Sequence, residues 1–266
     1  MMRDPAIDGN LADWLHPQLL RHRDYFANRR LLVDVGAYQG EFSRQTLIAA
    51  GSPFQEAVLF EPQPANVARL RERFAANPAV RIESSACDVA GGSHEFYCAG
   101  ETYTGSLLNY RSVPSAPLKR ITVTCVTLDA YLRDRRWTGN VGLIKTDTQG
   151  NDLRALQGAE ETLAQSRPWL VVELIYAPLY QGQAHPHELA AWLAAQGYVM
   201  AAQFDEYYSR DGWLGWSDGV FVPQELTTSR LSDYVPRPNA AEELVRRNPW
   251  NRLKRNLRRM MMHGRD

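Results

Sequence analysis

Residues 31–43 read LLVDVGAYQGEFS, and this stretch predicts the class of fold. A short apolar run ends at an acid, Asp34, and two glycines follow, Gly36 and Gly40. A buried strand that opens through glycine onto a helix is typical of the first βα turn in a doubly wound α/β sheet. We expect Gly36 to let the chain turn tightly and Gly40 to let the helix pack closely on the strand. An ordinary βα turn that binds no ligand is the alternative interpretation.

A second acid follows about one βα unit later. The apolar run 58–60 ends at Glu61, where such folds hold ribose hydroxyls, because a carboxylate accepts two hydrogen bonds. A dinucleotide site also needs a glycine two residues after the first, so that the backbone can approach the pyrophosphate. That position holds Tyr38. S-adenosylmethionine contains adenine and ribose without phosphates, so the loop favours S-adenosylmethionine over a dinucleotide.

Apolar runs and helical patterns alternate along the rest of the chain. Strands are expected at residues 31–33, 58–60, 80–82, 121–127, 141–147, 169–174, 198–204 and 219–222. Helices are expected at residues 11–26, 41–50, 65–76, 151–163 and 187–196, and a short one after residue 127. This order, closed by an antiparallel pair, predicts an α/β fold with a seven-stranded, mostly parallel sheet. We expect the first helix to pack on the edge of the sheet and the polar loop 100–116 to be functional or disordered.

Composition is that of an ordinary soluble protein. The 266 residues are 44% apolar and 23% charged, which suits one large α/β domain with appendages or two small domains. Three unclustered cysteines, Cys87, Cys98 and Cys125, predict neither a disulfide framework nor a zinc site. We nominate no metal ligands, since no ligand spacing demands one; a cation bound by the acids is the open alternative. The first residues lack the apolar core of a signal peptide and no run approaches a membrane span, so we expect a cytoplasmic protein.

Charge separates the C-terminal tail from the rest of the chain. Residues 241–266 contain 8 basic and 3 acidic residues, a net charge of +5, whereas the remaining 240 contain 22 and 27, a net charge of −5. The acidic body argues against a nucleic-acid partner. From Pro249 to Met261, apolar residues recur at helical spacing among arginines. This pattern predicts a basic amphipathic helix that binds either the inner face of an anionic membrane or a partner protein.

Residues 144–159 read IKTDTQGNDLRALQGA and resemble the most specific block of the FkbM family of S-adenosylmethionine-dependent methyltransferases. Three other pieces match in the same order: DVGAYQG at 34–40, Phe60-Glu61-Pro62 and Thr127-Leu128-Asp129. The resemblance covers about residues 31–222. It implies a Rossmann-like class I methyltransferase fold and methyl transfer, usually to an oxygen of a sugar, a glycan or another secondary metabolite. Gln149 stands where the family often has Glu, so we do not nominate it as a base.

The expected organisation is a helical leader at residues 1–30, a methyltransferase domain at 31–235 and a basic tail at 236–266. Ligands in such sheets lie beyond the carboxyl ends of the strands. The cofactor-binding candidates are Asp34, Gly36, Ala37, Tyr38, Gly40, Glu61, Pro62, Ala86, Cys87, Asp88 and Asp147. We expect Glu61 to hold the ribose, Ala86–Asp88 to contact the adenine and the turn at 36–40 to lie under the methionine part. A plain turn cap is the alternative role for Asp88.

Methyl transfer is an in-line displacement, so the enzyme mainly aligns the acceptor, the methyl group and the sulfur and excludes water. A sugar hydroxyl also profits from a positioned base. Asp147 is the first candidate for this base and Glu173 the second, while Lys145 orients either of them or is an outward-facing strand lysine. His185 is a further candidate, although the residues that follow it resemble a helix start. Candidates for stacking on a sugar are Tyr103, Tyr110, Tyr176, Tyr180, Trp213 and Trp216.

The leading hypothesis is an O-methyltransferase that acts on a sugar or glycan, within a surface polysaccharide or a glycosylated metabolite. Methylation of a polyketide or another small hydroxyl compound is the alternative among methyltransferases. A nicotinamide-dependent oxidoreductase is disfavoured by Tyr38, and a binding module without catalysis is kept open by Gln149.

Overall fold

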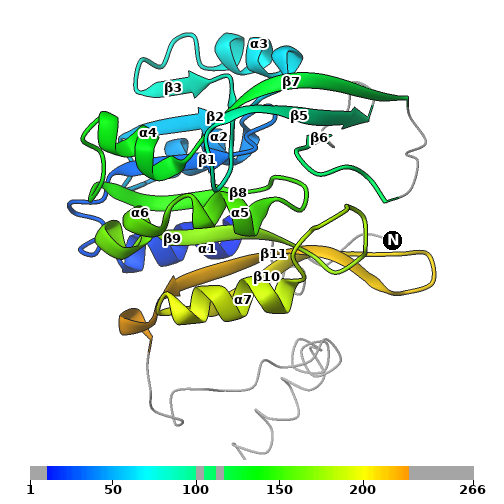
Figure 1. The fold of residues 1–266 in the computed structure, drawn as a ribbon. Helices are drawn as coiled ribbons and strands as arrows, with labels where there is room; N and C mark the ends of the chain where they lie inside the picture. The colour runs from blue at the N-terminus through cyan, green and yellow to red at the C-terminus, as the bar shows by residue number, and fades with distance from the viewer. Residues whose placement is uncertain (1–10, 100–104, 112–116, 228–266) are drawn as a thin grey trace, which may run out of the picture. The chain divides into compact units, whose positions relative to one another are not determined.

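Seven strands form the central sheet in the order β10-β11-β9-β8-β1-β2-β3 (Figure 1). Their bounds are β1 (Leu31–Val35), β2 (Glu56–Phe60), β3 (Val80–Glu83), β8 (Val141–Thr146), β9 (Trp169–Ile175), β10 (Tyr198–Tyr208) and β11 (Leu214–Pro223). The five strands from β3 to β9 pair in parallel, whereas β11 runs antiparallel to β9 and to β10. The computed structural model describes residues 11–99, 105–111 and 117–227. The predicted seven-stranded sheet with a C-terminal antiparallel hairpin is confirmed.

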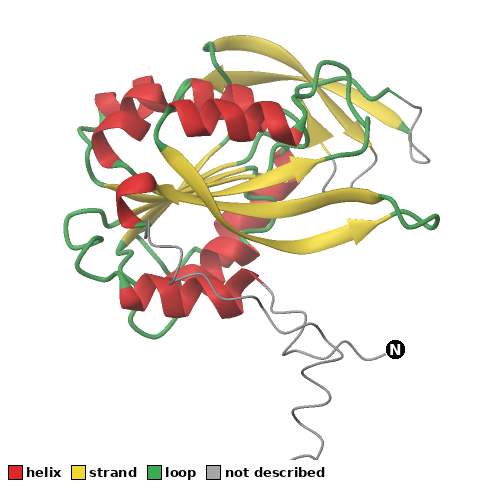
Figure 2. Cartoon of the chain, turned by 90° about the horizontal axis from the view of Figure 1, so that it is seen from below, coloured by secondary structure: helices red, strands yellow, loops and turns green. Residues whose placement is uncertain are grey.

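Helices cover both faces of this sheet, so the strands lie between two apolar layers (Figure 2). The helices are α1 (Leu11–Arg21), α2 (Glu41–Ile48), α3 (Pro64–Arg73), α4 (Leu128–Asp134), α5 (Asp152–Gln157), α6 (Glu160–Ser166) and α7 (Pro186–Ala195), and a 3₁₀ turn η1 (Gln224–Leu226) follows β11. Helices α1, α2 and α3 pack on one face and α4 to α7 on the other. Burial on both faces explains why the central strands are unbroken apolar runs.

The first helix packs on a face of the sheet rather than against its edge, which corrects our expectation. Leu11, Leu15 and Leu19 are buried along one side of α1. Trp14 lies 5.6 Å from Phe204 of β10, measured between ring centroids. The apolar stripe therefore contributes to the same core as the strands.

The helix predicted at 151–163 is two helices. Asp129 caps the second, since its carboxylate accepts hydrogen bonds from the backbone N–H groups of Glu161 and Thr162, both at 2.8 Å. At the break, a Cβ on Gly158 would lie 2.3 Å from the carbonyl oxygen of Asp88. The close approach and the new N-cap together end α5 and start α6.

The sequence did not predict a second sheet, of four strands in the order β4-β7-β5-β6. Its strands are β4 (Ser85–Cys87), β5 (Gly92–Ala99), β6 (Gly105–Ser106) and β7 (Leu118–Val126). The strand predicted at 121–127 belongs to this sheet and pairs with β5 across a long antiparallel ladder. The apolar side chains of Phe96, Val123 and Cys125 form its core. This sheet adds a wall beside the ends of β2 and β3 (Figure 1).

Three cysteines, Cys87, Cys98 and Cys125, are buried and free. Within the described ranges, no helix has the length and apolarity that crossing a membrane requires. The predicted amphipathic helix of the tail lies outside the described residues.

Candidate functional site

A cavity of about 200 Å³ lies at the carboxyl edge of the central sheet. Its walls come from the tips of β1, β2 and β8, from the loop after β8 and from the second sheet. The lining residues are Val35, Gly36, Tyr38, Phe60, Glu61, Pro62, Gln63, Ser85, Ala86, Cys87, Phe96, Gly105, Leu107, Asp147, Thr148, Gln149 and Asn151.

The turn after β1 is bent tightly against the loop after β8. Gly36 has φ +77°, and a Cβ there would lie 2.0 Å from the carbonyl oxygen of Asp147. Only glycine fits this approach. Gly40 is also left-handed, but a Cβ there would contact Leu70 within α3 and Phe74 just after it, rather than the strand. Gly40 therefore serves the packing of α2 on the α3 segment, which corrects the contact that we expected for it.

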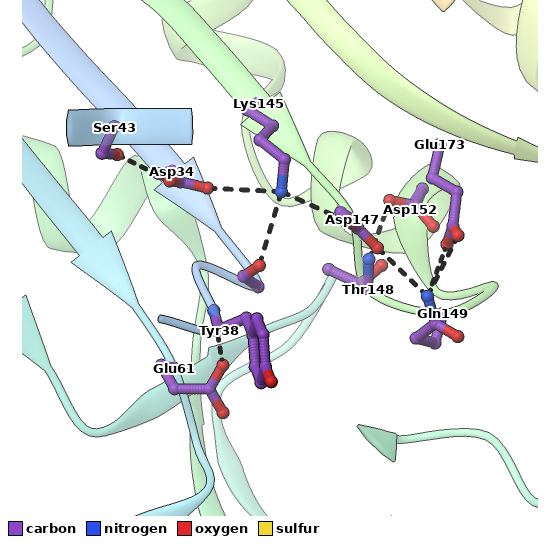
Figure 3. A network of polar contacts seen from close by, with 11 residues as sticks. Asp34, Tyr38, Ser43, Glu61, Lys145, Asp147, Thr148, Gln149, Asp152 and Glu173 are labelled. Atoms are coloured by element: carbon purple, nitrogen blue, oxygen red, sulfur yellow. Dashed lines mark hydrogen bonds and ion pairs between the residues drawn. The ribbon is translucent and has the colours of Figure 1, made fainter. Parts of the chain in front are cut away.

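Glu61 is the acid at the tip of β2, and its carboxylate faces the cavity. One oxygen accepts a hydrogen bond from the Tyr38 N–H at 2.9 Å (Figure 3). The other accepts from the Gln63 N–H, also at 2.9 Å. The side chain is buried, and this burial raises the pKa of Glu61 to about 7, although the two N–H groups act in the opposite direction. Tyr38, with φ +50°, adopts the left-handed conformation that presents its N–H to Glu61. The carboxylate is thus fixed in place and retains lone pairs for a ligand.

Lys145 of β8 forms ion pairs with Asp34 of β1 and with Asp147, which follows β8. Its ammonium lies 3.4 Å from Asp147, 3.6 Å from Asp34 and 3.4 Å from the Gly36 carbonyl oxygen (Figure 3). Burial lowers the pKa of Lys145, but Asp147, Asp34 and Asp218 outweigh it and raise the pKa above its ordinary value. Lys145 is therefore a permanent cation that orients Asp147, and the outward-facing alternative is wrong.

Gln149 connects the two candidate bases. Its amide nitrogen lies 3.1 Å from Asp147 Oδ1 and 3.0 Å from Glu173 Oε1 (Figure 3). Asp147 lines the cavity with a side chain that is 37% exposed, whereas Glu173 is only 8% exposed and does not line it. Burial raises the pKa of Glu173 well above its ordinary value, and Asp147 and Asp152 raise it further. Of the two acids, Asp147 is the one that a substrate can reach.

His185 is part of a helix cap. Its backbone N–H donates to Glu188 at 2.9 Å while its ring accepts from the His187 N–H, which forms a capping box at the start of α7. His185 does not belong to the described lining of the cavity. Its nomination as a base is not supported, and the helix-start alternative is what the structure contains.

Four cofactor candidates lie outside the described lining of the cavity: Asp34, Ala37, Gly40 and Asp88. Asp34 is fully buried and accepts a hydrogen bond from Ser43 at 2.6 Å in addition to its contact with Lys145. Asp88 accepts two hydrogen bonds from the Arg154 guanidinium, at 2.8 and 2.9 Å. Burial raises the pKa of Asp88, but Arg154 and the Val89 N–H prevail and hold it below its usual value. The expected contact of Asp88 with adenine is therefore unsupported.

Asn151 is a cavity residue that sequence reasoning missed. Its amide nitrogen donates to the Cys87 carbonyl oxygen at 3.3 Å, and its Oδ1 has no hydrogen-bond partner within the described part of the chain. Asn151 is 1% exposed, and its Oδ1 is buried without a partner among the described residues. The residue belongs to the block 144–159 and was read only as the start of a helix.

Phe96, Gly105 and Leu107 were missed for another reason. They reach the cavity from the second sheet and from the short described segment 105–111. Ser106 holds that segment by donating to the backbone oxygen of Gln149 at 2.8 Å. The loop prediction at 100–116 pointed to a functional segment without indicating where it would lie.

Two aromatic pairs lie at this edge, one between loops and one in the β10–β11 hairpin. Tyr110 and Tyr180 form an isolated β-bridge with ring centroids 5.0 Å apart. Tyr207 and Trp216 of the β10–β11 hairpin stack at 5.1 Å and 19°, and both are exposed. Trp213 is exposed at the hairpin end. Tyr103 lies outside the described residues.

Comparisons with known proteins agree with this architecture. The model of the Methyltransferase FkbM domain matches residues 34–200, which is more than half of the chain. No protein of curated function matches.

Solved structures with a similar fold include the three that follow. An FkbM methyltransferase from Methylobacillus flagellatus KT is 15% identical, with a TM-score of 0.49 over 81% of this chain and 48% of that one. A putative RNA methyltransferase from Pyrococcus horikoshii is 13% identical (TM-score 0.43; 81% and 84%). The magnesium protoporphyrin IX methyltransferase from Synechocystis PCC 6803, with bound SAM, is 10% identical (TM-score 0.43; 80% and 77%). The chain spans about half the length of the M. flagellatus protein. At these scores, the likenesses carry no argument about substrate.

Proposed function

Because the chain belongs to the FkbM methyltransferase family, we propose that it transfers a methyl group from S-adenosylmethionine to a hydroxyl of a sugar or glycan. The observation that carries this proposal is a single cavity with a fixed carboxylate, Glu61, at one strand tip and a reachable carboxylate, Asp147, at another. The first suits the ribose of the donor and the second suits the proton of the acceptor hydroxyl.

The cavity residues fit the donor in their chemistry. The Glu61 carboxylate suits a ribose hydroxyl, because it retains acceptor capacity beyond the hydrogen bonds from the Tyr38 and Gln63 N–H groups and the Asn66 side chain. Ala86 and Cys87 offer an apolar wall for adenine, and the unpartnered Oδ1 of Asn151 suits its amino group. The backbone of the Gly36 turn, which lines the cavity, suits the charged methionine part. When bound, the donor supplies an electrophilic methyl group on a sulfonium.

Asp147 acts as the base in this proposal. Lys145 and Gln149 contact different carboxylate oxygens, at 3.4 and 3.1 Å, and fix the orientation of the side chain. The acceptor hydroxyl passes its proton to Asp147 as the oxygen attacks. Bound donor and acceptor fill the cavity and thereby exclude water, which otherwise competes for the same position.

The exposed aromatic pair supports a sugar as acceptor. Trp216 stands two residues before Asp218 on β11, and Asp218 pairs in register with Glu173 of β9. Residues two positions apart in a strand are separated by about 7 Å, and their side chains face the same side of the sheet. The ring of Trp216 therefore lies beside Asp218 and Glu173. Aromatic faces beside carboxylates offer an apolar surface together with hydrogen-bond acceptors for hydroxyls.

The test is methyl transfer from labelled S-adenosylmethionine to a panel of oligosaccharides and lipid-linked glycans, with polyketide hydroxyl compounds as the comparison. We expect label on a sugar hydroxyl with the native chain and none with Asp147→Asn. Label on the non-sugar compounds alone would reject the sugar and keep the methyltransferase.

A further inference from the structure

Gln149 has an unusual position, because its amide group lies between two carboxylates. The nitrogen is 3.1 Å from Asp147 Oδ1 and 3.0 and 3.2 Å from the two oxygens of Glu173 (Figure 3). A carboxylate accepts hydrogen bonds and does not donate when it is ionised. The NH₂ group donates to both acids, because the carbonyl oxygen Oε1 accepts from the Tyr180 hydroxyl on the other side.

The rest of the residue is held so that the amide cannot turn away. The Tyr180 hydroxyl donates to Oε1 at 2.7 Å, which fixes the direction of the amide. The backbone of Gln149 is left-handed, with φ +56°, and its carbonyl oxygen accepts from Ser106 at 2.8 Å. A non-glycine residue in this conformation indicates that the surroundings impose the geometry.

The surroundings are strongly acidic. Asp152 and Glu173 are at least nine-tenths buried, Asp218 lies across from Glu173, and Asp147 completes the group. Burial and then Asp147 raise the pKa of Asp218 to about 7 and that of Asp152 to about 6. Among the described residues, Lys145 is the cation that contacts this group, and it is shared with Asp34. Such a cluster is stabilised when some of its members are protonated or when a cation lies between them, and proteins commonly use a divalent cation with oxygen ligands for the second purpose.

We propose that the Gln149 amide takes the place of a bridging cation between Asp147 and Glu173, and that the transfer site therefore needs no metal ion. Along the described ranges, no three His, Cys, Asp or Glu side chains are grouped to hold a metal. A third carboxylate at position 149 would complete such a group. The inference concerns the ion requirement of the same site and rests on the proposed function only for the role of Asp147.

The experiment compares thermal unfolding of the native chain with the Gln149→Glu variant between pH 5 and pH 8, without and with 1 mM Mn²⁺. A third carboxylate at this place has a raised pKa in the folded state. The folded variant therefore tolerates the protonated side chain at low pH and loses stability as the pH rises and the side chain ionises. We expect the Tm of the variant to fall about 5 °C further than that of the native chain from pH 5 to pH 8. Mn²⁺ should restore this difference and leave the native chain unchanged.

Three controls separate a bridge from a general packing effect. Gln149→Met removes the amide without adding charge, so its Tm should be lower at every pH and should not respond to Mn²⁺. Gln181→Glu makes the same change at an exposed position and should have no effect. The Mn²⁺ response of Gln149→Glu should disappear when Asp147→Asn is added.

Two results would overturn the proposal. The first is a Gln149→Glu variant that is as stable as the native chain at pH 8 without metal. The second is a native chain that Mn²⁺ stabilises through Asp147, because a cation would then already occupy the bridge. Neither result depends on the identity of the acceptor, so failure here is distinct from failure to find a methylated sugar.

Discussion

Replacing Glu61 by Gln should weaken donor binding by about 10- to 150-fold. Hydrogen bonds to a charged group contribute about 1.5–3 kcal/mol, and each 1.4 kcal/mol is about tenfold in affinity. Glu61→Gln keeps the size of the side chain but removes the charge and leaves an NH₂ opposite one of the N–H groups of Tyr38 and Gln63. Because burial raises the pKa of Glu61 to about 7, donor affinity should also depend on pH.

The pH dependence follows from that pKa. The carboxylate is the form that accepts the ribose hydrogen bonds, so donor affinity of the native chain should rise from pH 6 to pH 8 and that of Glu61→Gln should not. The sign for stability is the opposite. Because the folded pKa of Glu61 is raised, its contribution is fully present below pH 4.5 and is lost as pH rises through about 7.

Isothermal titration with S-adenosylhomocysteine at both pH values measures these affinities. Glu83→Gln is the matched control, since Glu83 ends the neighbouring strand and contacts Tyr131 outside the cavity. Its donor affinity should stay within about twofold of the native value. A Glu61→Gln variant with native Tm and native affinity at pH 8 would refute the ribose assignment.

Further predictions test the base, the acceptor surface and the tail. Asp147→Asn should keep donor affinity and lose about 10²- to 10⁴-fold in turnover; normal turnover would make Asp147 structural. Trp216→Ala should raise the acceptor KM several-fold at unchanged donor affinity, whereas Trp213→Ala at the hairpin end should have little effect; equal effects would reject the stacking surface. The full chain should float with anionic vesicles at low salt and a chain ending at Arg247 should not, because each basic residue contributes about 1 kcal/mol at such a surface. If neither floats, the tail binds a protein instead.

Features that depend on local pattern were predictable. The strand tips at Asp34, Glu61 and Asp147 follow from apolar runs that end in an acid, and parallel strands bring such tips to one edge of the sheet. For that reason, the cavity contains Gly36, Tyr38, Glu61, Pro62, Ala86, Cys87 and Asp147 as expected.

Features that depend on residues distant in the sequence were not predictable. Asp88 is expected to bind the cofactor, but its carboxylate accepts a hydrogen bond from Arg154, which lies 66 residues later. The break between α5 and α6 needs Asp129, which lies 32 residues before Glu161. The second sheet depends on the pairing of β5 with β7. These strands are separated in the sequence by a polar segment that does not predict this pairing. Side-chain charge and hydrogen bonding across such separations cannot be read from spacing alone.

The central claim, that the cavity is a methyl-donor site, is tested most directly by a crystal structure with S-adenosylhomocysteine. The account predicts the ribose hydroxyls within hydrogen-bond distance of Glu61, adenine against Ala86 and Cys87, and the amino-acid end against the Gly36 turn. A ligand bound elsewhere, or one whose ribose does not contact Glu61, would contradict it.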